Sequence, residues 1–108
     1  MPQYLVQVSY TSEALAALVS SPENRIVAVS KAVKKLGGKV HDGWMTFGEF
    51  DTALIMTLPD NVAAAAFAIA IGSGGACKDV RTTPLLSVSE GVEAMKAAGT
   101  LGYKPPAA

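Results

Sequence analysis

The segment TALIMTLP, residues 52–59, constrains the fold most, because it is apolar on both faces of a strand. Successive side chains of a strand point to opposite sides of the sheet, so Leu54 and Met56 would share one face. Ala53 and Ile55 would lie on the other face. An antiparallel sheet with one solvated face should instead alternate apolar and polar residues. The segment therefore predicts a central strand that is covered on both sides.

Three further strands are predicted around this one. Residues 4–10 alternate with period two and are rich in valine and tyrosine, as strands commonly are. Residues 39–47 and 77–87 are predicted as the second and fourth strands, and 51–58 as the third. Pro84 has no amide hydrogen, so the fourth strand is expected at an edge of the sheet.

The helices are predicted from their end signals. The pair Thr11-Ser12 can cap a short helix that ends near residue 20. A longer helix is expected from about residue 22, with a left-handed cap at Gly37-Gly38 as its end. Asp60 can cap an alanine-rich helix over residues 61–71. Ser87 and Glu90 have capping-box spacing before a short helix that ends near residue 98.

The resulting order, β-α-β-β-α-β with an extra C-terminal helix, predicts an α+β domain of the ferredoxin-like type. Its four-stranded antiparallel sheet would have the first and third strands in the centre and helices on one face. We expect a single domain over residues 1–99 and a C-terminal tail over 100–108, which carries two prolines.

Helices on one face leave the other face of the third strand uncovered. The interpretation that we favour is a second copy of the chain packed sheet against sheet, giving a homodimer or higher homo-oligomer of the dimeric α/β-barrel type. The alternative is that the C-terminal helix folds over the open face.

Composition excludes several classes of function. Nine basic and nine acidic residues give no net charge, which argues against nucleic-acid binding. The longest apolar run, residues 62–71, is about half of a membrane span, and no membrane association is expected. The N-terminus lacks a signal-peptide pattern, and the single cysteine, Cys77, forms no metal motif. We therefore expect a soluble cytoplasmic protein that uses no metal or cofactor.

The stretch TFGEFD, residues 46–51, is predicted to form a hairpin turn rather than a catalytic site. With Gly48 and Glu49 at the centre, glycine comes first, as in a type II′ turn. Asp51 is expected to tie the turn down through hydrogen bonds to Thr46 or to nearby amides. The register that follows pairs Phe47 with Phe50, Thr46 with Asp51, Trp44 with Ala53, Asp42 with Ile55, and His41 with Met56.

The candidate ligand-binding or catalytic residues are Tyr10, His41 and Arg81. We expect the first and third strands to run parallel to each other, which would bring these three residues toward one end of the sheet. Trp44, Phe47, Phe50 and Asp51 would then lie at the other end. A dyad of His41 and Asp51 is excluded by the register, which separates them by about 16 Å along the strand.

Several of these segments resemble the GYD domain family over about residues 3–95. They are YLVQVSYTSEA, KAVKKLGGKV, W-x-x-x-GEFD, ALIMTLPD and VRTTPLLS. The namesake triplet corresponds to Gly48, Phe50 and Asp51, with phenylalanine where the family commonly has tyrosine. No role that requires a phenol hydroxyl there is carried over. The resemblance implies a ferredoxin-like fold with oligomeric α/β-barrel relatives, and it implies no established substrate.

Two functions remain open at this point. The first is a non-enzymatic homo-oligomer that binds a small apolar or aromatic ligand between its sheet and its helices. The second is a cofactor-independent enzyme, similar to a monooxygenase or isomerase, that uses Tyr10, His41 and Arg81. An enzyme of this kind requires those three side chains to converge on a cavity of a few hundred cubic ångströms.

Overall fold

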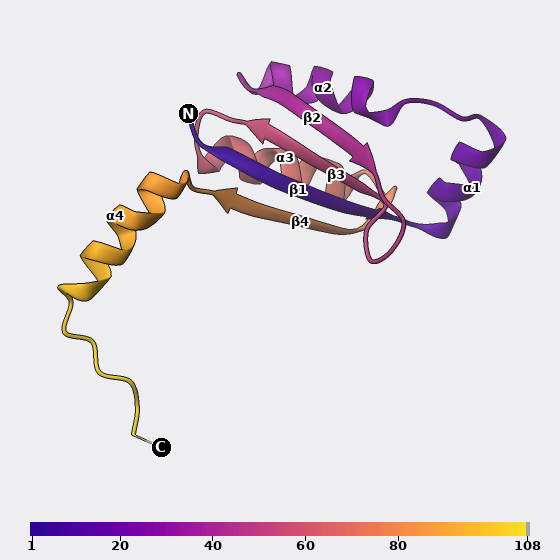
Figure 1. The fold of residues 1–108 in the computed structure, drawn as a ribbon. Helices are drawn as coiled ribbons and strands as arrows, with labels where there is room; N and C mark the ends of the chain where they lie inside the picture. The colour runs from indigo at the N-terminus through magenta and orange to yellow at the C-terminus, as the bar shows by residue number, and fades with distance from the viewer. Residues whose placement is uncertain (108) are drawn as a thin grey trace.

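The computed structural model describes residues 1–107 and shows four helices with one four-stranded sheet (Figure 1). The elements in chain order are β1 Gln3–Tyr10, α1 Ser12–Ser20, α2 Arg25–Lys35, β2 Lys39–Met45, β3 Thr52–Thr57, α3 Asn61–Ser73, β4 Cys77–Leu85 and α4 Val88–Gly99. The predicted α+β class and the number of strands are confirmed. Strands β2, β3 and β4 are each somewhat shorter in the structure than the strands predicted from the sequence.

The strands lie in the order β2-β3-β1-β4, and all neighbouring pairs are antiparallel. The first and third strands are central, and β4 with its Pro84 is an edge, as predicted. The expectation that β1 and β3 run parallel is wrong, since they pair antiparallel from Gln3–Thr57 to Val8–Thr52. After β1 the chain passes through α1 and α2 back to the start of the sheet, so β2 runs in the same direction as β1. The loop after β2 then turns the chain around, and β3 runs in the opposite direction.

One face of the sheet carries the core. Along each strand, every second side chain points to this core face, and the others point to the opposite, open face. The helices α2 and α3 cover the core face with Val33, Ala64 and Phe67. Burial of this apolar surface is the main force that holds the helices on the sheet. The sheet residues of this core are Tyr4, Val6, Val8, Leu54, Met56 and, just after β3, Leu58.

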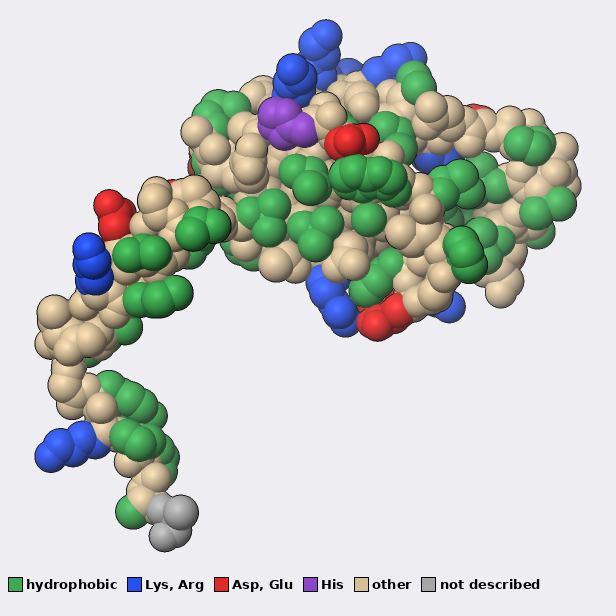
Figure 2. Space-filling view, viewed as in Figure 1, with side chains coloured by type: hydrophobic (Ala, Val, Ile, Leu, Met, Phe, Trp, Pro, Cys, Tyr) green, Lys and Arg blue, Asp and Glu red, His purple; other side chains and the backbone are tan. Residues whose placement is uncertain are grey.

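The open face also carries apolar side chains at its centre. Figure 2 views this face and shows hydrophobic side chains gathered below the histidine and its acidic neighbour. The register places Leu5 opposite Ile55 and Trp44 opposite Ala53 on this side. Trp44 remains 48% exposed, so in the single chain the open face is apolar and only partly covered.

The helix ends follow the predicted capping signals. The side chains of Thr11 and Asp60 accept hydrogen bonds from the amides of Ala14 and Ala63, at 3.1 and 2.9 Å. Of the glycine pair predicted to end α2, Gly37 takes the left-handed conformation, with φ +84°.

The start of α4 lies where it was predicted, whereas α2 starts later in the chain than predicted. The predicted capping box of α4 is present, with Ser87 and Glu90 bonded to each other's backbone amide. The helix α2 begins at Arg25 rather than near residue 22, because the Asn24 side chain caps it by accepting from the Ile26 amide at 3.0 Å.

The predicted hairpin register is correct near the turn and wrong farther out. Trp44 pairs with Ala53, and Asp42 with Ile55, as predicted. The Thr46 amide donates to the Asp51 carbonyl at 2.8 Å. Beyond Asp42 the ladder shifts by one residue, so Val40 instead of His41 lies opposite Met56. His41 is the extra residue of a β-bulge, which the residue count from the turn does not reveal.

The predicted type II′ turn is wrong. Among the described residues, positive φ values occur at Gly37, Gly75 and Gly102, whereas a type II′ turn requires one at Gly48. Phe47 and Phe50 form no pair, since Phe47 is fully exposed and Phe50 is only 7% exposed. Thr46 Oγ1 instead donates to the Phe50 carbonyl at 2.6 Å and holds a wider loop.

The helices α1 and α4 extend away from the sheet (Figure 1), and neither buries a residue. The radius of gyration is 17.2 Å, whereas a compact chain of this length has about 13 Å. Residues 100–107 contain no helix or strand. The division into a domain of residues 1–99 and a tail of 100–108 remains a prediction.

Candidate functional site

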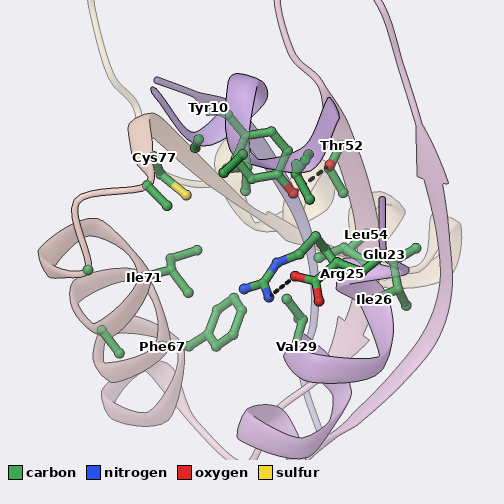
Figure 3. A pocket seen from close by; sticks show the side chains of 17 residues that line it. Tyr10, Glu23, Arg25, Ile26, Val29, Thr52, Leu54, Phe67, Ile71 and Cys77 are labelled. Atoms are coloured by element: carbon green, nitrogen blue, oxygen red, sulfur yellow. Dashed lines mark hydrogen bonds and ion pairs between the residues drawn. The ribbon is translucent and has the colours of Figure 1, made fainter. Parts of the chain in front are cut away.

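A cavity of about 490 Å³ lies between the core face of the sheet and the helices (Figure 3). It opens at the end of the sheet where β1 runs into α1. The same alternation of side chains that builds the core supplies the sheet wall of the cavity, and α1, α2 and α3 supply the other walls. The main apolar lining residues are Val8, Leu54, Ile26, Val29, Phe67 and Ile71.

Two hydroxyl groups lie together in the cavity wall. Tyr10 Oη and Thr52 Oγ1 are 3.1 Å apart and share a hydrogen bond, in which either oxygen can donate. Tyr10 ends β1 and Thr52 begins β3, so the antiparallel pairing brings the two residues to the same end of the sheet. They form a polar spot in a surface that is otherwise largely apolar.

A single ion pair borders the cavity. Arg25 Nη1 and Glu23 Oε1 are 2.8 Å apart, and the Arg25 side chain points from the start of α2 into the cavity (Figure 3). The same two residues also border a neighbouring hollow of about 630 Å³, which reaches Gly43 and Met45. The Arg25–Glu23 pair therefore stands between two adjoining spaces.

Cys77, the first residue of β4, lies in the cavity wall as a half-buried free thiol. Burial raises the pKa of the Cys77 thiol, and the positive charge of Arg25 opposes part of that rise. The thiol is thus held in its neutral form, and the electrostatic effect of Arg25 extends into the cavity.

The structure does not bring the three predicted site residues together. Tyr10 lines the cavity, whereas the His41 ring shares a hydrogen bond with Thr57 Oγ1 at the opposite end of β3. Arg81 pairs with Gln7 in the middle of β1 and lies outside the cavity lining. The expectation that β1 and β3 run parallel placed His41 at the Tyr10 end of the sheet and Asp51 at the other end. Both placements are wrong, since β2 runs in the direction of β1 and Asp51 bonds the Tyr10 amide.

The loop after β2 fastens the end of the sheet. Asp51 Oδ2 accepts a hydrogen bond from the Tyr10 amide at 2.8 Å, and the Asp51 amide donates to the Val8 carbonyl at 2.8 Å. Arg81 lies 5.0 Å from the Phe50 ring centroid and 3.4 Å from Glu49 Oε1. The loop therefore joins β3 to β1 and β4, with Asp51 and His41 far apart.

Sequence reasoning missed most of the cavity lining. Arg25, Phe67 and Ile71 were seen only as parts of helices, because the signals there are those of ordinary apolar helix faces. Within residues 1–107, no three His, Cys, Asp or Glu side chains are grouped as metal ligands would be. None of the helices in that range has the length and apolar character needed to traverse a bilayer.

Fold and site together define a small antiparallel α+β domain with an apolar cavity under its helices. The family model of the GYD domain matches residues 4–95, so the chain belongs to the GYD domain family. This confirms the resemblance seen in the sequence. The search of curated proteins gave no significant match to the chain.

Proposed function

We propose that this protein is a non-enzymatic, homo-oligomeric binding domain that holds a small apolar or aromatic molecule between its sheet and its helices. The observation that carries the proposal is the cavity of about 490 Å³ under α1, α2 and α3. Ligand sites of roughly 300–1,000 Å³ with apolar walls and a few polar groups are typical of small-molecule binding. The Tyr10–Thr52 hydroxyl pair supplies such a polar group.

Helix α1 supports the same proposal. It is rich in alanine and leucine, yet none of its residues is buried, although Ala14, Ala17 and Leu18 line the cavity. A bound apolar molecule would cover these side chains and remove apolar surface from water at about 25 cal/mol per Å². The ligand would thereby complete the packing of α1 on the sheet.

The catalytic alternative loses the arrangement on which it depended. It needed Tyr10, His41 and Arg81 around one cavity, and only Tyr10 lines this one. The location that we propose is the cytoplasm, a reducing compartment in which the free thiol of Cys77 is stable.

Binding can be tested with the neutral fluorescent probe N-phenyl-1-naphthylamine and a matched pair of variants in α3. Ala70 lines the cavity, whereas Ala66 is an exposed residue of the same helix outside the lining. Ala70→Leu should weaken probe binding at least about tenfold by filling the space, and Ala66→Leu should leave it unchanged. Equal binding by both variants, or no binding by the parent protein, would overturn the proposal.

The homo-oligomer is proposed to form through the open sheet face, in the manner of dimeric α/β barrels. The chain exposes 7602 Å², whereas a compact monomer of 11.1 kDa exposes about 5,700 Å². The excess of about 1,900 Å² includes the surface of the protruding α1 and α4, and it leaves room for the roughly 800 Å² that each partner buries in a standard interface. The chain's own α4 leaves the open face uncovered, so a second copy is the occupant that we propose.

Sedimentation velocity or light scattering tests this assembly. We expect a particle of at least twice 11.1 kDa, and Ile55→Glu on the open face should convert it to a folded monomer. Val62→Glu is the control, because Val62 is 78% exposed on α3, on the other side of the sheet. A monomeric parent protein would refute the proposed assembly. An Ile55→Glu variant that stays oligomeric would show that the interface does not lie on the open face of the sheet.

A further inference from the structure

The Arg25 guanidinium is the feature of the cavity that an apolar ligand alone leaves unexplained. Its side chain extends among Tyr10, Phe67 and Ile71 (Figure 3). Arg25 has one ion-pair partner, Glu23, which it contacts through Nη1 at 2.8 Å.

This pairing leaves most of the guanidinium free to bind something else. A guanidinium has five N–H donors in a planar fork, and a carboxylate can engage two of them at once. The side chain of Glu23 is 56% exposed and that of Arg25 is 44% exposed, so Glu23 is the more solvated partner and can turn toward water. Exposed pairs of this kind contribute little stability, and exchanging Glu23 for another carboxylate costs correspondingly little.

The other lining residues indicate the chemical character of the rest of the ligand. Apart from Glu23 and Arg25, the lining consists of apolar residues, the hydroxyls of Tyr10 and Thr52, and the thiol of Cys77. One guanidinium balances one negative charge, and no second cation lines this cavity to balance a phosphate dianion. The effect of Arg25 on the pKa of Cys77 agrees with a positive charge that acts inside the cavity.

We infer that the cavity takes an apolar monocarboxylate, aromatic or aliphatic, whose carboxylate replaces Glu23 on Arg25 while its apolar body lies between Phe67 and the sheet. This inference rests on the proposed binding function and specifies its ligand class. Glu23 then acts as an internal competitor that holds Arg25 when the cavity is empty.

Calorimetry with 2-naphthoate and its neutral counterpart 2-naphthalenemethanol tests the inference. Naphthoate should bind at least about tenfold more tightly than the alcohol. Arg25→Gln should weaken naphthoate binding by about tenfold to a hundredfold, the range of a charge-assisted hydrogen bond, with little effect on the alcohol. Glu23→Gln should tighten naphthoate binding severalfold, because it removes the competing carboxylate.

Arg81→Gln is the matched control, since Arg81 also pairs with a glutamate, Glu49 at 3.4 Å, but lies outside the cavity lining. It should leave naphthoate binding unchanged, and circular dichroism checks that each variant is folded. If the alcohol binds as tightly as naphthoate and Arg25→Gln has no effect, the carboxylate inference falls while the binding function stands. If neither compound binds the parent protein, both proposals fail.

Discussion

The Asp51 carboxylate accepts a hydrogen bond from the backbone amide of Tyr10 at 2.8 Å, across 41 positions of sequence. This contact fixes the loop after β2 to the end of β1, directly beside the cavity wall that Tyr10 and Thr52 form. The last residue of the family's namesake triplet thus positions the site without lining it.

Removing this carboxylate should destabilise the whole sheet. Asp51→Ala leaves the Tyr10 amide without its acceptor, and hydrogen bonds to charged groups contribute about 1.5–3 kcal/mol. We expect a loss of that size in the free energy of unfolding, measured by urea denaturation. Asp79→Ala, at an exposed position of β4, should change it by no more than about 0.5 kcal/mol. Equal effects of the two substitutions would show that the contact contributes nothing.

Gly38 should tolerate no side chain. A Cβ at this position would collide with the carbonyl oxygen of Thr57 and lie 2.7 Å from Leu58 Cδ2. Because a backbone atom cannot yield as a side chain does, Gly38→Ala should cost about 3 kcal/mol or more.

The control for that substitution is Gly72→Ala in α3, where a Cβ would have no neighbour within 4 Å. Alanine favours helix, so this variant should be as stable as the parent or up to about 1 kcal/mol more stable. Thermal unfolding of the two variants side by side measures the difference. A Gly38→Ala protein as stable as the parent would contradict the close approach of α2's end to β3.

The start of α4 should respond to acid. Hydrogen bonds from the Ser87 backbone and side chain lower the pKa of Glu90 below its ordinary 4.5. A lowered folded-state pKa means that the capping box stabilises α4 fully above the unfolded-state pKa and loses this effect as pH falls through the folded value. Amide exchange at Ser87, corrected for the intrinsic exchange rate at each pH, should therefore accelerate as the pH falls through the lowered pKa of Glu90.

Nuclear magnetic resonance titration of the Glu90 carboxyl provides the direct measurement. The midpoint should lie below 4.5 in the parent protein and move up toward that value in Ser87→Ala, which loses the cap. A midpoint of 4.5 or above in the parent protein would mean that the capping box does not hold Glu90.

The pH dependence of alkylation at Cys77 reports on the charge in the cavity. Burial raises the pKa of this thiol above its ordinary 9.0, and Arg25 opposes the rise. The midpoint of iodoacetamide alkylation against pH should therefore lie above 9.0 and move higher still in Arg25→Gln. Following the midpoint rather than the rate separates charge from access. A midpoint that falls in Arg25→Gln would refute this electrostatic coupling, and Arg81→Gln should leave it unchanged.

The elements and their ends could be predicted because their signals are local. Thr11, Asp60 and Ser87 each satisfy an amide within three residues, and Gly37 takes its conformation from the turn that it occupies. The pairing of Trp44 with Ala53 also followed from counting outward from the loop.

What the sequence did not reveal depends on contacts between distant segments. The bulge at His41 shifts the ladder, whereas the glycine of β2, Gly43, lies in regular register opposite Leu54. Phe50 turns inward toward Arg81, which lies 31 positions later in the chain. The cavity forms because Arg25, Phe67 and Tyr10 come from three different elements, and nothing in their spacing indicates that they meet. The direction of β3 relative to β1 was the error with the largest consequence, because it reversed β2 as well and so placed His41 at the wrong end of the sheet.

The two edges of the sheet limit how copies of this chain can add to one another. On the β2 edge the bulge at His41 interrupts the regular spacing of hydrogen-bonding groups, and on the β4 edge Pro84 supplies no amide hydrogen. A further strand arriving at either side would meet a broken ladder, which opposes open-ended, fibre-like growth. In contrast, the open face of the sheet can hold one partner, and once that partner is bound no further copy can add there. The irregular edges therefore favour a finite assembly.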